Sequence, residues 1–263
     1  MFFRHILLGM TVFMGSTALA RSEIPAESGL CLTVHLVNLQ KKPVTDFAID
    51  EPVWLCVELK NTNSEPMSIW LNGDKNRGIT CRPEDHSREK IKCVSKGVSL
   101  EQNFHMTVLS PGKGITVEVP LGDFMAMTES GTLGLLCAME IKDQKRQWLI
   151  IESEISVHVN DRLTSRDMLR LFGQIKEMLS SGDEQTRIRM VRSCHSLPGQ
   201  EKMAALTIVL ADDTEDVQLA ALEVFAMSGI SKEQAAPFLQ KALQSKFEAV
   251  RSSATFANGL RMY

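Results

Sequence analysis

The sequence predicts a multidomain β + α protein, in which an antiparallel β-sandwich is followed by a short array of helical repeats. Residues 27–160 alternate apolar and polar side chains, whereas residues 164–263 show helical spacing and an internal repeat. The 263 residues, 23% charged and 44% hydrophobic, suffice for one large domain or two ordinary domains with buried cores.

The N-terminal segment predicts export. Arg4 gives residues 2–5 a basic character, residues 6–14 are apolar, and residues 18–20 read Ala-Leu-Ala. A basic start, an apolar segment too short to span a bilayer and a small-residue cleavage site are typical of a signal peptide. We therefore expect residues 1–20 to be removed after Ala20, leaving an exported protein without membrane insertion. It would be periplasmic or extracellular, and periplasmic if the source is a Gram-negative bacterium.

Export makes the cysteines informative, because an oxidising compartment permits disulfides. Cys81 and Cys93 both lie in the polar stretch 73–96. We predict a bridge between them, which would close a long and otherwise unsupported loop. No Cys-x-x-Cys occurs, so neither a redox motif nor a zinc knuckle is indicated.

The pairing of Cys31, Cys56 and Cys137 is left open. Cys56 is out of phase with its apolar neighbours and Cys137 is in phase with its own, so a bridge between these two is disfavoured. Cys31 shares the outward parity of Cys56, which keeps a Cys31–Cys56 pair as an alternative.

Strand-like alternation recurs along the first half. It covers five runs, at residues 30–36, 53–60, 115–119, 133–141 and 149–159. Each run has one apolar face and one wetter face, as antiparallel sheets with a single packed side require. Turn residues separate the runs, as in Asn61–Pro66, Asn72-Gly73 and Pro111-Gly112. About seven or eight short strands without helical spacing between them favour a β-sandwich.

Two segments resemble the immunoglobulin-like sandwiches of exported bacterial proteins. One is residues 55–67, where a turn of the type Asn-Thr-x-Ser-x-Pro joins two strands. The other is residues 109–133, where Leu-Ser-Pro-Gly precedes a strand and leads to Gly131-Thr132. Leu133 stands where the pattern usually has tyrosine, so no tyrosine corner can form there. The resemblance implies a fold and says little about activity.

The second half repeats itself. Leu206, Leu210, Val217 and Ala221 recur 33 positions later as Leu239, Leu243, Val250 and Ala254. Thr164 or Ser165 is a suitable N-cap for the first helix, and Gly182-Asp183 separates it from the second. A period near 33 marks stacked helical pairs, here at about 165–199, 200–231 and 232–263.

Residues 210–226 resemble the HEAT family, with an acidic turn followed by small residues where helices pack closely. Val250-Arg251 supplies the usual pair, whereas Gln218 stands where arginine is usual and the first unit has Thr186-Arg187. Arg187, Gln218 and Arg251 occupy matching positions, and in this family such residues often form a structural polar ladder. We therefore predict a HEAT-like array with such a ladder.

The reactive side chains do not form a recognisable catalytic motif. Adjacent helical residues point about 100° apart, so Cys194-His195 is not a nucleophile–base pair, and Cys194 fits a core position. Glu84, Asp85 and His86 belong to a stretch that is best interpreted as a solvated loop. Glu152 and Glu154 share a strand face without an indicated cleft. We predict no catalytic, cofactor-binding or metal-binding residues.

These observations favour an exported, non-enzymatic protein-binding or scaffold module of the cell envelope. The partner is expected to be another protein, since a net charge of −3 without a dense basic run gives no reason to expect nucleic acid. Self-association through the C-terminal helix is a further expectation. The alternative is a proteinase inhibitor that presents the 73–96 loop, and a weaker alternative is a hydrolase that uses His86.

Overall fold

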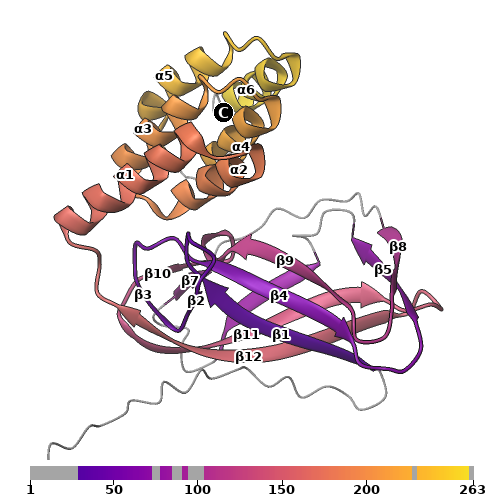
Figure 1. The fold of residues 1–263 in the computed structure, drawn as a ribbon. Coiled ribbons are helices and arrows are strands. Elements are labelled where there is room, and N and C mark those ends of the chain that lie inside the picture. The colour runs from indigo at the N-terminus through magenta and orange to yellow at the C-terminus, as the bar shows by residue number, and fades with distance from the viewer. Residues whose placement is uncertain (1–28, 73–77, 85–90, 94–103, 227–229, 261–263) are drawn as a thin grey trace, which may run out of the picture.

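The computed structural model describes residues 29–72, 78–84, 91–93, 104–226 and 230–260, with strands in the first part of the chain and helices in the second (Figure 1). The last strand, β12, ends at Asn160, and the first helix, α1, begins at Ser165. This β + α arrangement agrees with the predicted fold class. The signal-peptide prediction falls on residues 1–20, which lie outside the described residues.

The strands form two larger sheets and one small sheet in the described part of the chain. The first sheet has the order β2 (Pro43–Val44), β1 (Leu30–Val37), β4 (Trp54–Asn61), β9 (Gly114–Pro120). The second has the order β3 (Asp46–Ala48), β12 (Trp148–Asn160), β11 (Gly131–Lys142), β5 (Met67–Asn72), β8 (Phe104–Leu109), and β6 (Ile79–Pro83) also pairs with β11. The small sheet pairs β10 (Met125–Met127) with β7 (Ile91–Cys93).

One pair departs from the predicted antiparallel arrangement. β3 pairs with β12 in parallel, with Phe47 opposite Val159. The chain leaves the β1–β2 hairpin, crosses to the other sheet and continues directly into β3. Because β3 is reached by a crossover between sheets and not by a hairpin, it need not run antiparallel to its neighbour. It runs in the same direction as β12.

The core of the strand half lies between the two larger sheets. Leu55 and Val57 of β4 belong to the same buried apolar cluster as Leu133 and Leu135 of β11. All five predicted strand runs overlap strands, and their apolar positions are mostly buried, although the outward residues Trp54 and Cys56 of β4 are buried as well. Period-2 patterning therefore placed the inward faces correctly.

The interpretation of residues 73–96 as an unsupported loop is wrong. β6 and β7 both lie in this stretch, and Ile79, Cys81 and Pro83 of β6 point into the core while Thr80 is exposed. Only a few residues of each strand alternate, and charged segments surround them. The signal is therefore too short to stand out from a polar stretch.

The helical half contains α1 (Ser165–Ser181), α2 (Glu184–Ser193), a 3-10 turn η3 (Cys194–Ser196), α3 (Gly199–Val209), α4 (Glu215–Ala226), α5 (Lys232–Ala242) and α6 (Glu248–Leu260). The side chain of Thr164 caps α1 by accepting the backbone N–H of Asp167, as predicted, and Asp183 caps α2. The helices share a second apolar core. They lie over the end of the sheets that carries β10 and β7, away from β5 and β8 (Figure 1).

The predicted polar ladder is confirmed. Arg187, Gln218 and Arg251 each donate a side-chain hydrogen bond to a backbone carbonyl of the turn before their helix, at 2.9, 2.6 and 2.8 Å. The ladder also crosses between turns. Arg187 Nε lies 3.0 Å from Asp212 Oδ2, and Ser245 Oγ donates to Gln218 Oε1 at 2.7 Å. These contacts supply hydrogen-bond donors to backbone carbonyls of the turns, and they link each helical pair to the next.

Candidate functional site

The strand half and the helical half meet on the outer face of β4. Trp54 and Cys56 point away from the core between the sheets, as their parity predicts, yet they are only 3% and 6% exposed. Helix α2 buries them from the outside. Alternation gave their direction correctly, but not their burial.

Helix α2 presents different faces to the two halves. Met190 and Val191 pack into the helical core together with Cys194. Arg189 and Ser193 are one turn apart on the same side of the helix, which places both toward β4. Arg189 is 7% exposed, so this face carries a buried cation into the junction.

The buried cation of Arg189 has partners on the strand side of the junction, although its Nε has none among the described residues. Its guanidinium lies 4.3 Å from the centroid of the Trp54 ring, forms an ion pair with Glu118 of β9 and donates to the backbone carbonyl of Asn38 at 3.3 Å. Trp54 Nε1 donates to Ser193 Oγ at 3.0 Å. These five residues are called the seam below. A cation stacked on indole and paired with a carboxylate is a strong and geometrically specific contact.

Burial shifts the pKa values of Arg189 and of the neighbouring Cys56 in the expected directions. Burial lowers the pKa of Arg189, because it penalises the charged form. Burial, and secondarily the nearby Glu58, raises the pKa of the Cys56 thiol. Cys56 is therefore held as a neutral thiol, which argues against a nucleophilic role.

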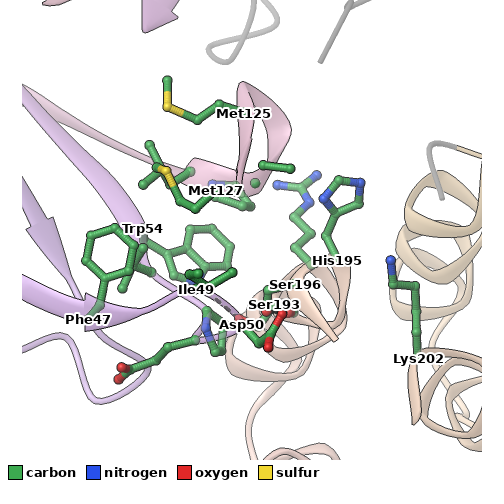
Figure 2. A pocket seen from close by; sticks show the side chains of 18 of the residues that line it. Phe47, Ile49, Asp50, Trp54, Met125, Met127, Ser193, His195, Ser196 and Lys202 are labelled. Carbon is green, nitrogen blue, oxygen red and sulfur yellow. Dashed lines mark hydrogen bonds between the residues drawn. The ribbon is translucent and has the colours of Figure 1, made fainter. Parts of the chain in front are cut away.

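A cleft of about 320 Å³ opens beside the seam, between the two halves (Figure 2). It is lined by Phe47, Ile49, Asp50, Glu51, Pro52, Val53, Trp54, Pro120, Leu121, Gly122, Met125, Ala126, Met127, Arg162, Arg192, Ser193, His195, Ser196 and Lys202. A volume of this size lies at the small end of ligand sites in proteins. This space is called the cleft below.

The strand side of the cleft is mainly apolar. Figure 2 shows Phe47, Ile49 and Trp54 grouped on one side, with Met125 and Met127 of β10 above them. The methionines adapt their shape easily, so this wall can fit apolar groups of different outline.

The helical side of the cleft is polar and mainly basic. His195 and Ser196 come from η3, Arg192 from α2, and Lys202 from α3, which faces η3 across the open space (Figure 2). A Cβ added at Gly122 would lie 3.0 Å from His195 Nδ1, so the short helix η2 (Leu121–Asp123) packs directly on this histidine.

Lys202 is the most unusual of these residues. It is 9% exposed, and no hydrogen bond or ion pair joins its ammonium to any residue in the described part of the chain. Burial lowers the pKa of Lys202. The smaller effect that raises this pKa comes from Cys194 and not from a carboxylate. Burial raises the pKa of Cys194 itself to about 12, so this thiol stays neutral and provides no counter-charge.

The other charged side chains of the cleft have a hydrogen-bond or ion-pair partner. Arg162 Nη1 lies 2.8 Å from Asp50 Oδ1. Arg192 Nη2 lies 3.4 Å from Glu223 Oε2, outside the cleft. Glu51 Oε2 accepts the backbone N–H of Ala48 at 3.1 Å.

The described reactive side chains on β12 do not converge on a site. His158 is exposed on the outer face of β12, where its Nδ1 lies 3.3 Å from Thr132 Oγ1. Glu152 and Glu154 are exposed on the same face. His86 and Asp85 lie outside the described residues, so the hydrolase hypothesis stays a prediction.

The pair Cys194-His195 divides as the helical geometry predicts. Cys194 is fully buried and donates to the Met190 carbonyl at 3.3 Å, whereas His195 lines the cleft. The role of His195 as a lining residue was not predicted. Lys202 was also missed, because a lysine on a helix is ordinarily solvated.

The positions of the cysteines differ from one of the expectations. Cys56 lies opposite His35 in the β1–β4 register, while Cys31 lies opposite Lys60, so the alternative Cys31–Cys56 pairing is wrong. Cys81 faces Cys137 across β6 and β11. The side chain of Cys93 lies outside the described residues, so the predicted Cys81–Cys93 bridge stays a prediction.

No helix in the described ranges has the length and apolar character needed to cross a bilayer. Among the same residues, no group of three or more His, Cys, Asp or Glu side chains is placed to hold a metal ion.

Comparison with protein families and with curated proteins finds no match. Among solved structures, the chain is similar to the segment of Escherichia coli alpha-2-macroglobulin from domain MG7 to the C-terminus, at 10% identity, TM-score 0.29, 89% of this chain and 55% of that one. A Salmonella alpha-2-macroglobulin matches at 10% identity, TM-score 0.29, 88% of this chain and 20% of that one.

A Listeria innocua beta-glucosidase matches at 12% identity, TM-score 0.21, 51% of this chain and 16% of that one. The chain thus spans 55% or less of the length of these three structures. Likeness at these TM-scores carries no argument about fold or function.

Proposed function

We propose that this chain is an exported, non-enzymatic binding module of the cell envelope, which takes a partner protein at the cleft. The observation that carries the proposal is that both halves build one cleft, with an apolar wall from the strands and a basic wall from the helices. Concave sites with an apolar lining and a few convergent polar groups are the usual form of binding sites. The described side chains in the cleft form no nucleophile–base pair.

The seam supports a binding role because it fixes the two walls relative to each other. Arg189 and Ser193 reach across the junction to Trp54 and Glu118. A cleft whose walls are held by buried contacts is preorganised, and preorganisation lowers the entropic cost of binding.

The finer fold assignment belongs to the same proposal. We assign the strand half, residues 27–160, to the immunoglobulin-like sandwiches and the helical half, residues 164–263, to the HEAT-like arrays. The shared core of the two sheets and the ladder through Arg187, Gln218 and Arg251 support this assignment. On this view, the helical array packs α2 and η3 against the sandwich and so completes the cleft.

Site-specific photo-crosslinking in the envelope tests the proposed function. A photoreactive residue at Ser196, which lines the cleft, is expected to capture one recurring protein partner. The same group at Leu169, which is 71% exposed on α1, should not capture that partner.

A matched pair of space-filling variants sharpens the test. Ala126→Trp fills the cleft from an exposed position, and Ala236→Trp places the same bulk on the exposed face of α5. The adduct from position 196 should disappear in the first variant and persist in the second. An adduct that survives Ala126→Trp, or no recurring adduct at all, would contradict the proposal.

Self-association through the C-terminal helix stays a prediction. Phe256 of α6 is 70% exposed, which agrees with such a contact. The proteinase-inhibitor alternative also stays a prediction, because much of the 73–96 stretch that it invokes lies outside the described residues.

A further inference from the structure

Lys202 is only 9% exposed, and its ammonium, which opens into the cleft, has no counter-charge among the described residues. Removing a charged group from water is costly unless a partner compensates it, which is why buried cations are ordinarily paired. The neighbouring Arg189 has such a partner in Glu118, at a place where the cation joins the two halves of the protein. At Lys202 the described residues supply no such partner, which leaves the ammonium available to an anionic ligand in the cleft.

The surroundings of Lys202 define the chemistry of that group. An anion on the ammonium would lie close to His195, with the apolar wall of Phe47, Ile49 and Met127 across the cleft (Figure 2). The bound molecule therefore needs an apolar part as well as a negative charge. A space of about 320 Å³ suits one small apolar group and its anionic end rather than a folded domain.

The acidic residues of the cleft limit the charge of the ligand. Asp50 and Glu51 line the same space. Arg162 pairs with Asp50, whereas Glu51 Oε2 accepts a backbone N–H and forms no ion pair among the described residues. A dianion such as a phosphate monoester would be repelled more than a monoanion, so a carboxylate fits better.

We propose that the cleft binds a carboxylate joined to an apolar group, with Lys202 as its ionic partner. Two sources share this chemistry, namely the free C-terminus of a polypeptide that ends in an apolar residue, and a free fatty acid. The inference rests on the proposed function of the cleft as a binding site and names the group that it recognises.

Isothermal titration calorimetry with matched probes tests the inference. The probes are acetyl-Ala-Leu with a free carboxylate, the same peptide as its amide, decanoate, and decanamide. At least one carboxylate should bind at millimolar concentration or below, and about tenfold more tightly than its amide, as the loss of a charge-assisted hydrogen bond requires. Preference for the peptide or for decanoate identifies the source.

Lys202→Met provides the decisive variant. Carboxylate binding should be lost, while the melting temperature of the free protein should rise by about 2–4 °C because an uncompensated buried charge has been removed. The matched control is Lys176→Met, which changes an exposed lysine of α1 and should alter neither quantity. The rise in melting temperature also shows that the variant folds.

Several results would overturn the carboxylate inference. These are equal binding of acid and amide, carboxylate binding that survives Lys202→Met, or no carboxylate binding at all. If the crosslinked adduct at Ser196 persists in any of these cases, the binding function stands and only the ligand class is wrong. If neither carboxylate binding nor the crosslinked adduct at Ser196 is observed, the cleft is not a binding site.

A separate observation concerns Cys81 and Cys137, which lie directly opposite each other on β6 and β11. Glu84 N–H donates to the Gly134 carbonyl at 2.9 Å, and Glu140 N–H donates to the Gly78 carbonyl at 2.7 Å. Hydrogen-bonded and non-hydrogen-bonded pairs alternate along an antiparallel ladder, so the two cysteines occupy a non-hydrogen-bonded pair. Their Cα atoms are then about 4.5 Å apart, within the range that a disulfide spans.

We infer that Cys81 and Cys137 form a disulfide when the chain folds in an oxidising compartment. The two sulfur atoms lie 2.9 Å apart in the core. Thiol–disulfide exchange with oxidised glutathione balances the step. One thiolate attacks the glutathione disulfide and releases one reduced glutathione, and the second cysteine displaces the other, leaving one protein disulfide and two reduced glutathiones. The bond would use Cys81 and so exclude the predicted Cys81–Cys93 bridge.

Refolding of the denatured, reduced protein with oxidised glutathione tests this pairing. Peptide mapping under non-reducing conditions should link the peptides of Cys81 and Cys137. Cys93→Ser should keep the link, and Cys137→Ser should lose it and melt at a lower temperature. A Cys81–Cys93 link in the wild-type protein, or free thiols at both core positions after oxidative refolding, would refute the inference.

Discussion

Arg189 and Lys202 are both buried cations at the junction of the strands and the helices, but their surroundings differ. Arg189 stacks on Trp54 and pairs with Glu118, so the seam compensates its charge. Lys202 has no such partner among the described residues. Burial lowers the pKa of both side chains, which marks the cost of desolvation in each place. The comparison separates a charge used to hold two halves together from a charge held ready for a ligand.

The largest expected effect comes from breaking the seam pair. Glu118→Ala leaves Arg189 buried without its carboxylate, which should lower the free energy of unfolding by about 3 kcal/mol. Guanidinium denaturation followed by circular dichroism measures the change. Asp50→Ala is the control, because its partner Arg162 is 64% exposed and that pair should contribute less than about 1 kcal/mol. Equal losses in the two variants would show that the seam pair has no structural role.

The next largest effect concerns the hydrogen bond that the Trp54 indole donates to Ser193. Ser193→Ala removes the acceptor of the buried indole N–H, and an unsatisfied buried donor costs about 1–3 kcal/mol. The same denaturation measurement applies, with the exposed Ser180→Ala as control. If Ser193→Ala is as harmless as Ser180→Ala, the indole bond does not hold the two halves together.

The contrast between Arg189 and Lys202 also shows where sequence patterns stop being informative. Alternation located the strands that build the core, and the repeat located the helices and the ladder, because both patterns record burial within one half. The junction depends on how the two halves pack. Trp54 and Cys56 carried a usable signal, since two apolar residues on an outward strand face suggest a cover.

Other residues carried no such signal. Arg189 and Lys202 are both cations on helices, and the sequence does not distinguish a solvated cation from one buried by a neighbouring domain. Cys81 was placed correctly in a polar stretch but not in a strand, since charged residues surround the short run that pairs it with Cys137. The seam and the cleft therefore became visible only with the packing of α2 on β4.

The pH dependence of stability gives a smaller test of the Lys202 environment. Because burial lowers its pKa, Lys202 loses its proton in the folded state at a lower pH than in the unfolded state. The loss of stability caused by burying the charged lysine is therefore present in full below the folded pKa. It disappears as the pH rises through the unfolded pKa of about 10.4.

The measurement is the difference in unfolding free energy between Lys202→Met and the wild-type protein, from about pH 8 to about pH 10. The advantage of the variant should shrink over this range. Burial raises the pKa of the neighbouring Cys194 to about 12, so this thiol stays neutral over the range. Starting above the ordinary histidine range keeps His195 out of the window. A constant difference would mean that burial does not perturb Lys202.

The smallest effect tests the helix that carries the seam. Asp183 caps α2, and the backbone N–H of Thr186, which donates to Asp183 Oδ1 at 2.7 Å, lowers the pKa of its carboxyl. A lowered carboxyl pKa adds stability that is present above the ordinary value of about 3.9 and is lost as the pH falls through the folded value.

Asp183→Asn keeps an oxygen that can cap the helix but removes the charge. The wild-type protein should therefore melt at a slightly higher temperature than the variant at neutral pH, and the two melting temperatures should converge as the pH falls below about 4. Because Asp183 is exposed, added salt should also reduce the difference. A difference that persists unchanged at low pH would show that the charge does not contribute. The cap would then position Arg189 and Ser193 through hydrogen bonding alone.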